Sequence, residues 1–264
     1  MTLTTGSAVP VSTHGSSSPD LLLPLAQACA VHQPNLLPRL STLAKLFAAD
    51  VWVVLDDVQF ARRDFQHRTR LAALGDAEHW RWLSLPTHLP GGRSTIVKDA
   101  RLADPEPSSR RMEGMIHHAY RRSPPWPAIE AVLAPVLATL RETDRTAVVA
   151  EISTRALLAA LDWQGQIRHS WELTARRGRS ERLADLAVAS GSTSYLCGTG
   201  GMRYLDHTPF RAQGIAVIPF STPPDDVWEQ GSRVTALWAL AVLGPASLAS
   251  MLRSAARLNR QGRR

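Results

Sequence analysis

Two short apolar segments separated by one amphipathic segment constrain the fold of this chain most strongly. The apolar run 26–31 predicts a strand that stops before Pro34, and the run 51–55 predicts a second strand. Between them, residues 38–49 place apolar side chains at helical spacing: Leu40, Leu43, Ala44 and Phe47. A strand–helix–strand unit joins two parallel strands by a right-handed crossover. The pattern therefore predicts an α/β fold.

The rest of the chain repeats this pattern and interrupts it once. Residues 80–85 alternate in the manner of a strand, whereas residues 108–161 have helical periodicity throughout. After this segment, strand and helix patterns alternate again: strands at 166–169, 194–197 and 215–220, helices at 180–189 and 234–257. We therefore predict one α/β domain over residues 25–258, with a mostly parallel sheet built from strand–helix units and a helical insertion at about 108–161.

Composition limits the class of protein. Residues 1–24 are rich in Ser, Thr, Gly and Pro and are expected to be a disordered tail, and residues 259–264 form a basic tail. The formal charge of +7 comes almost wholly from Arg, because the chain has two lysines, Lys45 and Lys98. This charge favours anionic partners, although genome composition can produce the same Arg bias.

The low cysteine count and the lack of a long apolar run predict where the protein is located. Two cysteines give no disulfide framework. No apolar run reaches the ~18 residues of a membrane span, and no signal peptide is evident. We therefore expect a cytoplasmic protein without a membrane partner, and the sequence leaves its oligomeric state open.

Polar side chains follow both strands of the first unit where each strand ends. His32 and Gln33 follow the first strand, and Asp56, Asp57 and Gln59 follow the second. In an open parallel sheet both ends lie on the carboxyl edge, where ligand crevices form. We predict catalytic roles for His32 as general base, oriented by Asp57, and for Asp56. The structural alternative is that Asp56 caps a turn and His32 bonds a backbone group.

A segment rich in hydrogen-bond donors comes next. Guanidinium groups bind carboxylate or pyrophosphate in a bidentate manner. Substrate binding is predicted for Gln33 and Gln59, and for the residues of this segment: Arg62, Gln66, His67, Arg68 and Arg70. The alternative is a solvated charged loop. Trp80 and Trp82 share one face of their strand, and we expect them in the core.

A Gly-rich turn after residues 194–197 is the second concentrated signal. It lacks the Gly-Lys-Ser/Thr end of a P-loop and the spacing of a dinucleotide fingerprint, yet its amides can approach a ligand closely. Cys197 is a candidate nucleophile if the amides lower its pKa, and a small buried residue otherwise. The predicted binding residues here and in the helical segment are His117, Tyr120, Tyr195, Gly198, Gly201, Tyr204 and Asp206. Arg176 to Arg182 offer a second anion contact.

No cofactor or metal is expected. Adjacent His117 and His118 point about 100° apart on a helix, and no His-x-x-x-His spacing occurs. A metal held by His32, Asp56 or Asp57 remains the lesser alternative.

These segments resemble the WbqC-like protein family between about residues 30 and 220. The resemblance is carried by short runs in that family's order: His32-Gln33-Pro34, Leu55 to Phe60, Gln66 to Arg70, Trp82 to Pro86 and Tyr195 to Gly198. Family members usually have Asn at the position of His67 and Ser at that of Cys197. The family's acidic residue in the last apolar helix has no counterpart in residues 234–243.

The resemblance implies a role in polysaccharide or specialised-metabolite biosynthesis, antibiotics included. Some members of the family are similar to glycyl or other acyl transferases that form amides on amino sugars. We therefore expect an amide-forming acyl or aminoacyl transferase acting on an amino sugar, a nucleotide sugar or a natural-product amine, with aminoacyl-tRNA as one candidate donor. The alternatives are a hydrolase using the same carboxylates and a non-catalytic protein that binds a nucleotide sugar.

Overall fold

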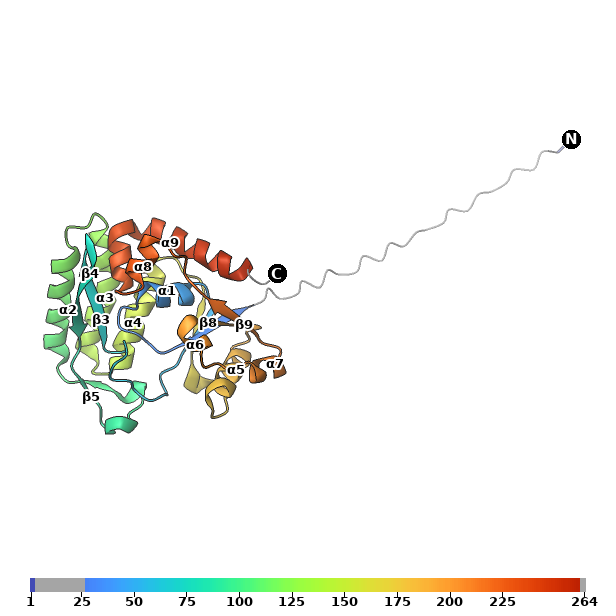
Figure 1. The fold of residues 1–264 in the computed structure, drawn as a ribbon, viewed down its shortest axis with the longest axis horizontal. Helices are drawn as coiled ribbons and strands as arrows, with labels where there is room; N and C mark the ends of the chain where they lie inside the picture. Colours follow the sequence, from blue (N-terminus) through green and yellow to red (C-terminus); the bar gives the residue numbers. More distant parts are fainter. Residues whose placement is uncertain (3–26, 262–264) are drawn as a thin grey trace.

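The protein is built around a parallel sheet of five strands (Figure 1). The computed structural model describes residues 1–2 and 27–261, so the predicted tail of residues 1–24 lies almost wholly outside the described residues. The sheet has the order β7-β2-β1-β8-β9. Its strands are β1 (Ala28–His32), β2 (Val51–Val54), β7 (Gln166–His169), β8 (Ser194–Gly198) and β9 (Ala216–Phe220). Each neighbouring pair is parallel, which confirms the predicted α/β class.

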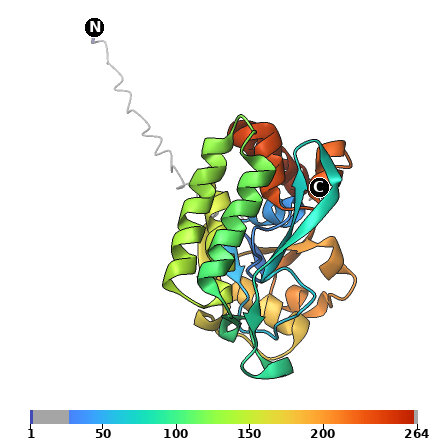
Figure 2. The same ribbon diagram turned by 90° about the vertical axis from the view of Figure 1, so that its left-hand side faces the viewer.

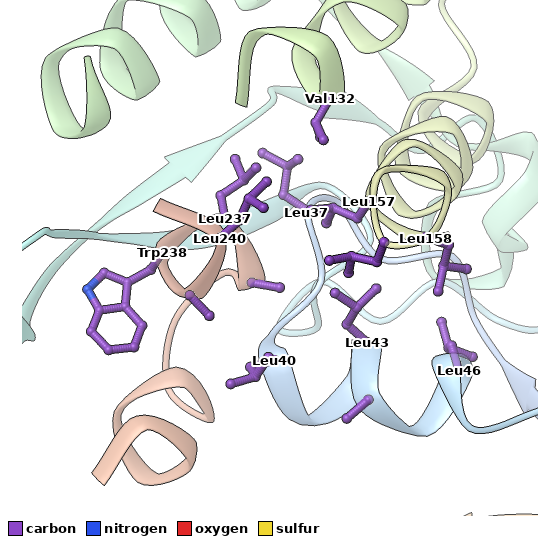
Figure 3. Close-up of a cluster of buried hydrophobic side chains, with 14 of the residues drawn as sticks. Leu37, Leu40, Leu43, Leu46, Val132, Leu157, Leu158, Leu237, Trp238 and Leu240 are labelled. Atoms are coloured by element: carbon purple, nitrogen blue, oxygen red, sulfur yellow. The ribbon is translucent and has the colours of Figure 1, made fainter. Parts of the chain in front are cut away.

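Helices cover both faces of this sheet because alternate strand residues point to opposite sides. Ala30, Trp52 and Leu196 belong to one core cluster, which also contains the buried sides of three helices: α1 (Leu40–Phe47), α4 (Thr146–Ala160) and α9 (Ala236–Gln261). Figure 3 shows leucines of α1, α4 and α9 meeting in this cluster. Cys29 and Cys197 belong to the second cluster, with α5 (Arg179–Ala189) and α7 (Thr208–Ala212).

The predicted helical insertion consists of three helices. These are α2 (Pro105–Tyr120), α3 (Trp126–Glu142) and α4, and α3 packs against both of its neighbours. Val132 of α3 and Leu157 of α4 lie in the same core cluster as the sheet residues. The insertion therefore shares its core with the sheet.

The predicted strand at 80–85 lies outside the main sheet, in an antiparallel hairpin of β3 (Arg68–Ala73) and β4 (Asp76–Ser84). Figure 2 shows the hairpin running beside α2. Trp80 and Trp82 are half-buried, so the expectation that both lie in the core is corrected. The alternation of Arg68 and Arg70 with inward-facing Thr69 and Leu71 explains why β3 reads as a polar loop in the sequence.

The remaining elements are short. They are β5 (Thr87–His88), β6 (Arg101–Leu102), α6 (Thr199–Met202), α8 (Asp226–Gly231) and 3-10 turns at Gly92–Ser94, Val97–Asp99 and Ser170–Glu172.

Helix α9 closes the fold and contains a kink. Gly244 has φ +75 and is followed by Pro245, which interrupts the helical hydrogen bonds. In the described part of the chain, α9 alone is long and apolar enough to cross a membrane, and half of its apolar stretch is buried inside the fold. Arg260, predicted in a basic tail, is helical and pairs with Asp50 at 3.1 Å.

Candidate functional site

The strand order places a topological switch point between β1 and β8. The chain leaves β1 through α1 to reach β2 on one side, whereas β8 and β9 lie on the other side of β1. Pairing of β1 with β8 runs through Ala28–Ser194 and Cys29–Tyr195, while pairing of β1 with β2 extends to His32. The carboxyl ends of β1 and β8 therefore separate, at the place where open α/β sheets bind ligands.

His32 ends β1 as a neutral, half-buried imidazole. Its Nδ1 donates to the carbonyl oxygen of Gln33 at 2.7 Å, because a carbonyl oxygen can only accept. This bond leaves Nε2 as an acceptor. Burial lowers the pKa of His32 to about 3, and the charge of Lys45 adds to the effect. At neutral pH His32 is therefore a hydrogen-bond acceptor and only a weak base.

Asp57 is paired with residues far along the chain rather than with His32. Its carboxylate accepts hydrogen bonds from Ser170 Oγ and from Arg182, both at 2.5 Å. Burial alone raises the pKa of Asp57, but Ser170 and Arg182 outweigh it and hold the pKa below its usual value. The predicted orientation of His32 by Asp57 is therefore wrong. Asp57 instead ties the loop after β2 to α5.

Asp56 differs sharply from its neighbour. It is 7% exposed, and its Oδ1 has no hydrogen-bond partner among the described residues. Burial raises its pKa, with His169 opposing the effect. His169 lies beside the end of β2, since it pairs with Val54 in the sheet register, and its Nδ1 is also buried without a partner in residues 27–261. The ends of β2 and β7 thus hold a buried acid and an imidazole.

Gln33 and Gln66 bring the donor-rich segment to the end of β1. The side-chain amide of Gln66 donates to the side-chain oxygen of Gln33. Gln66 is fully buried, and its own Oε1 has no partner in the described part of the chain. His67 packs against Phe60, with ring centroids 5.3 Å apart, and burial together with Arg68 and Arg62 lowers its pKa to about 4.

Three arginines stack on three aromatic rings beside this segment. Their guanidinium carbons lie 4.2–4.4 Å from a ring centroid: Arg39 over Phe65, Arg68 over Trp82 and Arg70 over Trp80. We call these six residues the Arg–aromatic face. Cation–π contacts fix the guanidinium planes. None of the three arginines forms an ion pair with a carboxylate in residues 27–261, and Nε of Arg39 and Arg70 is buried without a partner there.

Two other predicted binding residues lie outside the Arg–aromatic face. Arg62 is exposed, and the Gln59 side chain is used to donate to the carbonyl oxygen of Arg93 at 2.7 Å.

At the end of β8, packing explains the glycine turn. A Cβ on Gly201 would lie 2.9 Å from Cys197 Sγ, so a side chain there would collide with Cys197. Gly198 ends β8 itself. Burial raises the pKa of Cys197, with Lys45 opposing, so the predicted lowering of its pKa is wrong. The thiol is neutral at pH 7.

The three other predicted binding residues after residue 194, Tyr195, Tyr204 and Asp206, have local roles in the fold. Tyr195 is buried and stacks on Phe210 with centroids 5.2 Å apart. Tyr204 is 66% exposed under Arg179, and Asp206 accepts from the Thr208 amide at the start of α7. The structure does not bring Tyr195 to the surface of the carboxyl edge.

His117 and Tyr120 also lie apart from the strand ends. Their helix, α2, packs against β3 and α3 instead. Tyr120 is fully buried in the main core, and His117 is exposed beside Trp126, with ring centroids 5.4 Å apart. Neither reaches the site that the sequence predicted for them. In residues 1–2 and 27–261, no three His, Cys, Asp or Glu side chains gather in a way that would hold a metal ion.

A sequence model of the WbqC-like protein family matches residues 33–236, which include the loop after β1, the Arg–aromatic face, the end of β2 and the turn after β8. The chain belongs to the WbqC-like protein family. It is also similar to the uncharacterized protein Rv1507c of Mycobacterium tuberculosis, with 23% identity over 194 residues, or 72% of this chain and 80% of that protein. No solved structure matches significantly.

Sequence reasoning missed four polar residues of this WbqC-like site. His169 ends a predicted strand, so the strand-end rule that selected His32 also applies to it. Lys45 stands among Leu43, Ala44 and Leu46 in an apolar helix, which is a detectable signal. Nothing local marks Arg39 or Ser170.

Proposed function

We propose that this protein is an amide-forming acyl or aminoacyl transferase that acts on an amino sugar or natural-product amine in polysaccharide or specialised-metabolite biosynthesis. The observation that carries the proposal is a set of buried hydrogen-bond acceptors without partners at one edge of the sheet. Asp56 Oδ1 and Gln66 Oε1 have no donor among residues 27–261, and His32 presents an unprotonated Nε2. An amine supplies donors that satisfy such acceptors.

The energetics favour an amine as the ligand. A buried acceptor without a donor costs roughly 1–3 kcal/mol. Two such oxygens are retained at the carboxyl edge, on Asp56 after β2 and on Gln66 beside Gln33. Binding of an ammonium group offsets this cost and also neutralises the charge of Asp56.

The proposed reaction uses Asp56 as proton acceptor. The acceptor amine loses a proton to the carboxylate, its lone pair attacks the acyl carbonyl carbon, and a C–N bond forms. The bond from that carbon to the donor oxygen or sulfur breaks, and the leaving group takes up the proton. Burial raises the pKa of Asp56 toward the working pH, which suits a general base. His32 orients the amine, and Asp57 positions the loop.

The Arg–aromatic face supports recognition of an anionic donor or acceptor. Its guanidinium groups have no carboxylate partners in the described part of the chain, and phosphate or carboxylate oxygens fit such groups. An aminoacyl-tRNA, a CoA thioester and a nucleotide-linked amino sugar all carry phosphates. A cytoplasmic location gives access to each of them.

The test is product formation by the full chain. Amino sugars and UDP-linked amino sugars are incubated with glycyl-tRNA or with acyl-CoA thioesters, and mass spectrometry detects the amide. The rate of product formation should fall by about 10²-fold or more in Asp56→Asn, because a general base typically contributes about 10²–10⁴-fold. Asp50→Asn, at the opposite edge of the sheet, is the matched control and retains turnover.

Three outcomes separate the alternatives. Turnover that RNase abolishes identifies an aminoacyl-tRNA donor, whereas turnover of a thioester after RNase excludes a requirement for tRNA. Release of free acid without amide identifies a hydrolase. A rise in Tm with a UDP-linked amino sugar, without turnover of any donor, contradicts the transferase and identifies a binding protein.

A further inference from the structure

Lys45 is a buried amine that the proposed reaction does not use. It belongs to α1 and is 8% exposed. Its Cδ lies 3.9 Å from the position that a Cβ on Gly198 would occupy, so the side chain passes the last residue of β8. Its charge acts on His32 at the end of β1 and on Cys197. The side chain therefore lies beside the end of β8, next to the place where the two strands separate.

The charge of Lys45 has no partner in the described protein. Lys45 forms no ion pair with a carboxylate in residues 27–261. The nearby thiols do not balance it, because burial raises the pKa of Cys29 to about 11 and raises that of Cys197 as well. His32 is neutral at pH 7. Burial lowers the pKa of Lys45 to about 8, so the group is still mostly charged at neutral pH.

An uncompensated buried charge destabilises a fold unless a ligand supplies the opposite charge. The position of Lys45 indicates that a ligand supplies this opposite charge. The pairing of β1 with β8 ends at Cys29–Tyr195, before the strand ends, and Gly198 places no side chain beside the lysine. A carboxylate or phosphate oxygen carries the required charge and accepts hydrogen bonds from an ammonium group.

We propose that Lys45 is an anion-binding residue, whose ammonium group holds a carboxylate or phosphate oxygen of a small substrate between the carboxyl ends of β1 and β8. This site uses none of the residues of the Arg–aromatic face. It does not depend on amide formation, because the lysine binds the anion whether the ligand is then transformed or only bound.

The chain offers an unusually direct test, since Lys45 and Lys98 are its only lysines. Reductive methylation with formaldehyde and cyanoborohydride is followed at each lysine by peptide mass spectrometry. Phosphate, acetate or chloride is added at matched ionic strength. We expect phosphate or acetate to slow methylation of Lys45 about fivefold at about four times its Kd, relative to chloride. Lys98 serves as the internal control and should not respond.

The two anions distinguish the chemistry of the substrate group. Protection by phosphate alone identifies a phosphate, and protection by acetate alone identifies a carboxylate. Equal methylation of Lys45 in all three salts overturns the proposal.

Variants provide a second, independent measurement. The protecting anion should raise the Tm of wild type and of Lys98→Met, and this shift should vanish in Lys45→Met. Without the anion, Lys45→Met should melt at the wild-type temperature or above, because methionine removes the unpaired charge and keeps the aliphatic chain. An unchanged anion shift in Lys45→Met overturns the proposal. If that variant does not fold, the methylation of wild type still decides.

Discussion

The two edges of the central sheet differ in how their polar groups are used. At the amino edge, a cavity of about 360 Å³ is lined by Asp50, Trp163, Arg260 and their neighbours. Asp50, Trp163 and Arg260 each have protein partners there. Asp50 accepts from the Ala28 amide at 2.8 Å and from Arg260 at 3.1 Å, and the Trp163 indole donates to Ala49 at 2.9 Å. At the carboxyl edge, Asp56 Oδ1 has no hydrogen-bond partner and Lys45 has no ion-pair partner within residues 27–261.

This difference separates a cavity from a candidate site. At the amino edge, hydrogen bonds from Arg260 to Ala48 and Asp50 hold the end of α9 against the sheet. At the carboxyl edge, Asp56 and Lys45 carry groups without these protein partners in the described part of the chain, and a ligand can supply those partners. We therefore place the candidate site by unpaired charge and hydrogen-bonding groups rather than by cavity volume. The predictions below test that contrast, beginning with the largest effect.

The largest effect is expected for Lys45→Met as a function of pH. The folded-state pKa of Lys45, about 8, lies below the ordinary lysine value of 10.5, so the unfolded state binds more protons between these two pH values. The stability of wild type relative to Lys45→Met should therefore rise from pH 8 to pH 10.5, by about 3 kcal/mol in all. Urea unfolding at several pH values measures it, with Lys98→Met as control. Parallel curves of unfolding free energy against pH for wild type and Lys45→Met would contradict an unpaired Lys45.

The adjacent carboxylates at the end of β2 should contribute to stability to different extents. Arg182→Met leaves Asp57 half-buried without its cation and should lower the free energy of unfolding by about 2–3 kcal/mol. Asp56→Asn should change it by less than about 1 kcal/mol, because the affected oxygen has no protein partner. Similar losses in the two variants, measured by urea unfolding at pH 7, would remove the distinction between a structural and a functional carboxylate.

Asp57 also makes a contribution to the stability of the fold that is lost in acid. Its folded-state pKa is held below the usual value, so the stability it adds is present above the unfolded pKa of about 3.9 and is lost as pH falls through the folded pKa. Arg182→Met should lose part of that acid dependence. An unchanged pH dependence below pH 4 would show that the pair contributes nothing.

Packing at the end of β8 predicts a smaller effect. Gly201→Ala should destabilise the protein by about 1–2 kcal/mol, because the new Cβ would approach Cys197 Sγ to 2.9 Å. Combining it with Cys197→Ala should recover part of the loss in a double-mutant cycle of thermal unfolding. Purely additive losses would show that the two residues do not collide.

The smallest effect belongs to the amino edge. Arg260→Ala breaks a solvent-exposed ion pair with Asp50 and should cost no more than about 0.5 kcal/mol. It should also leave turnover unchanged. A loss of turnover in this variant would move the functional site to the amino edge.

Local patterns predicted the frame of the site but not its pairings. Apolar runs located β1, β2, β7, β8 and β9, and the rule that strand ends meet placed His32 and Asp56 at one edge. The same rule paired His32 with Asp57, whose actual partner, Arg182, lies 125 residues away. No local periodicity encodes such a contact.

Tertiary packing also decided where the aromatic and small residues lie. Tyr195 and Cys197 face the cluster beneath α5, because alternate residues of β8 point to opposite sides of the sheet. Tyr120 lies in the core because of the position in which α2 packs, and the sequence alone does not reveal that position. Trp80 and Trp82 stack on arginines of β3, a strand that their own spacing does not reveal.

Hydrogen–deuterium exchange of the full chain with and without a UDP-linked amino sugar tests the central claim most directly, because it reports both edges in one experiment. The account predicts slower exchange at residues 32–36, 55–67 and 196–202, at the carboxyl edge. It predicts no change at residues 48–50, 162–166 and 253–260. Protection confined to the amino edge would contradict it.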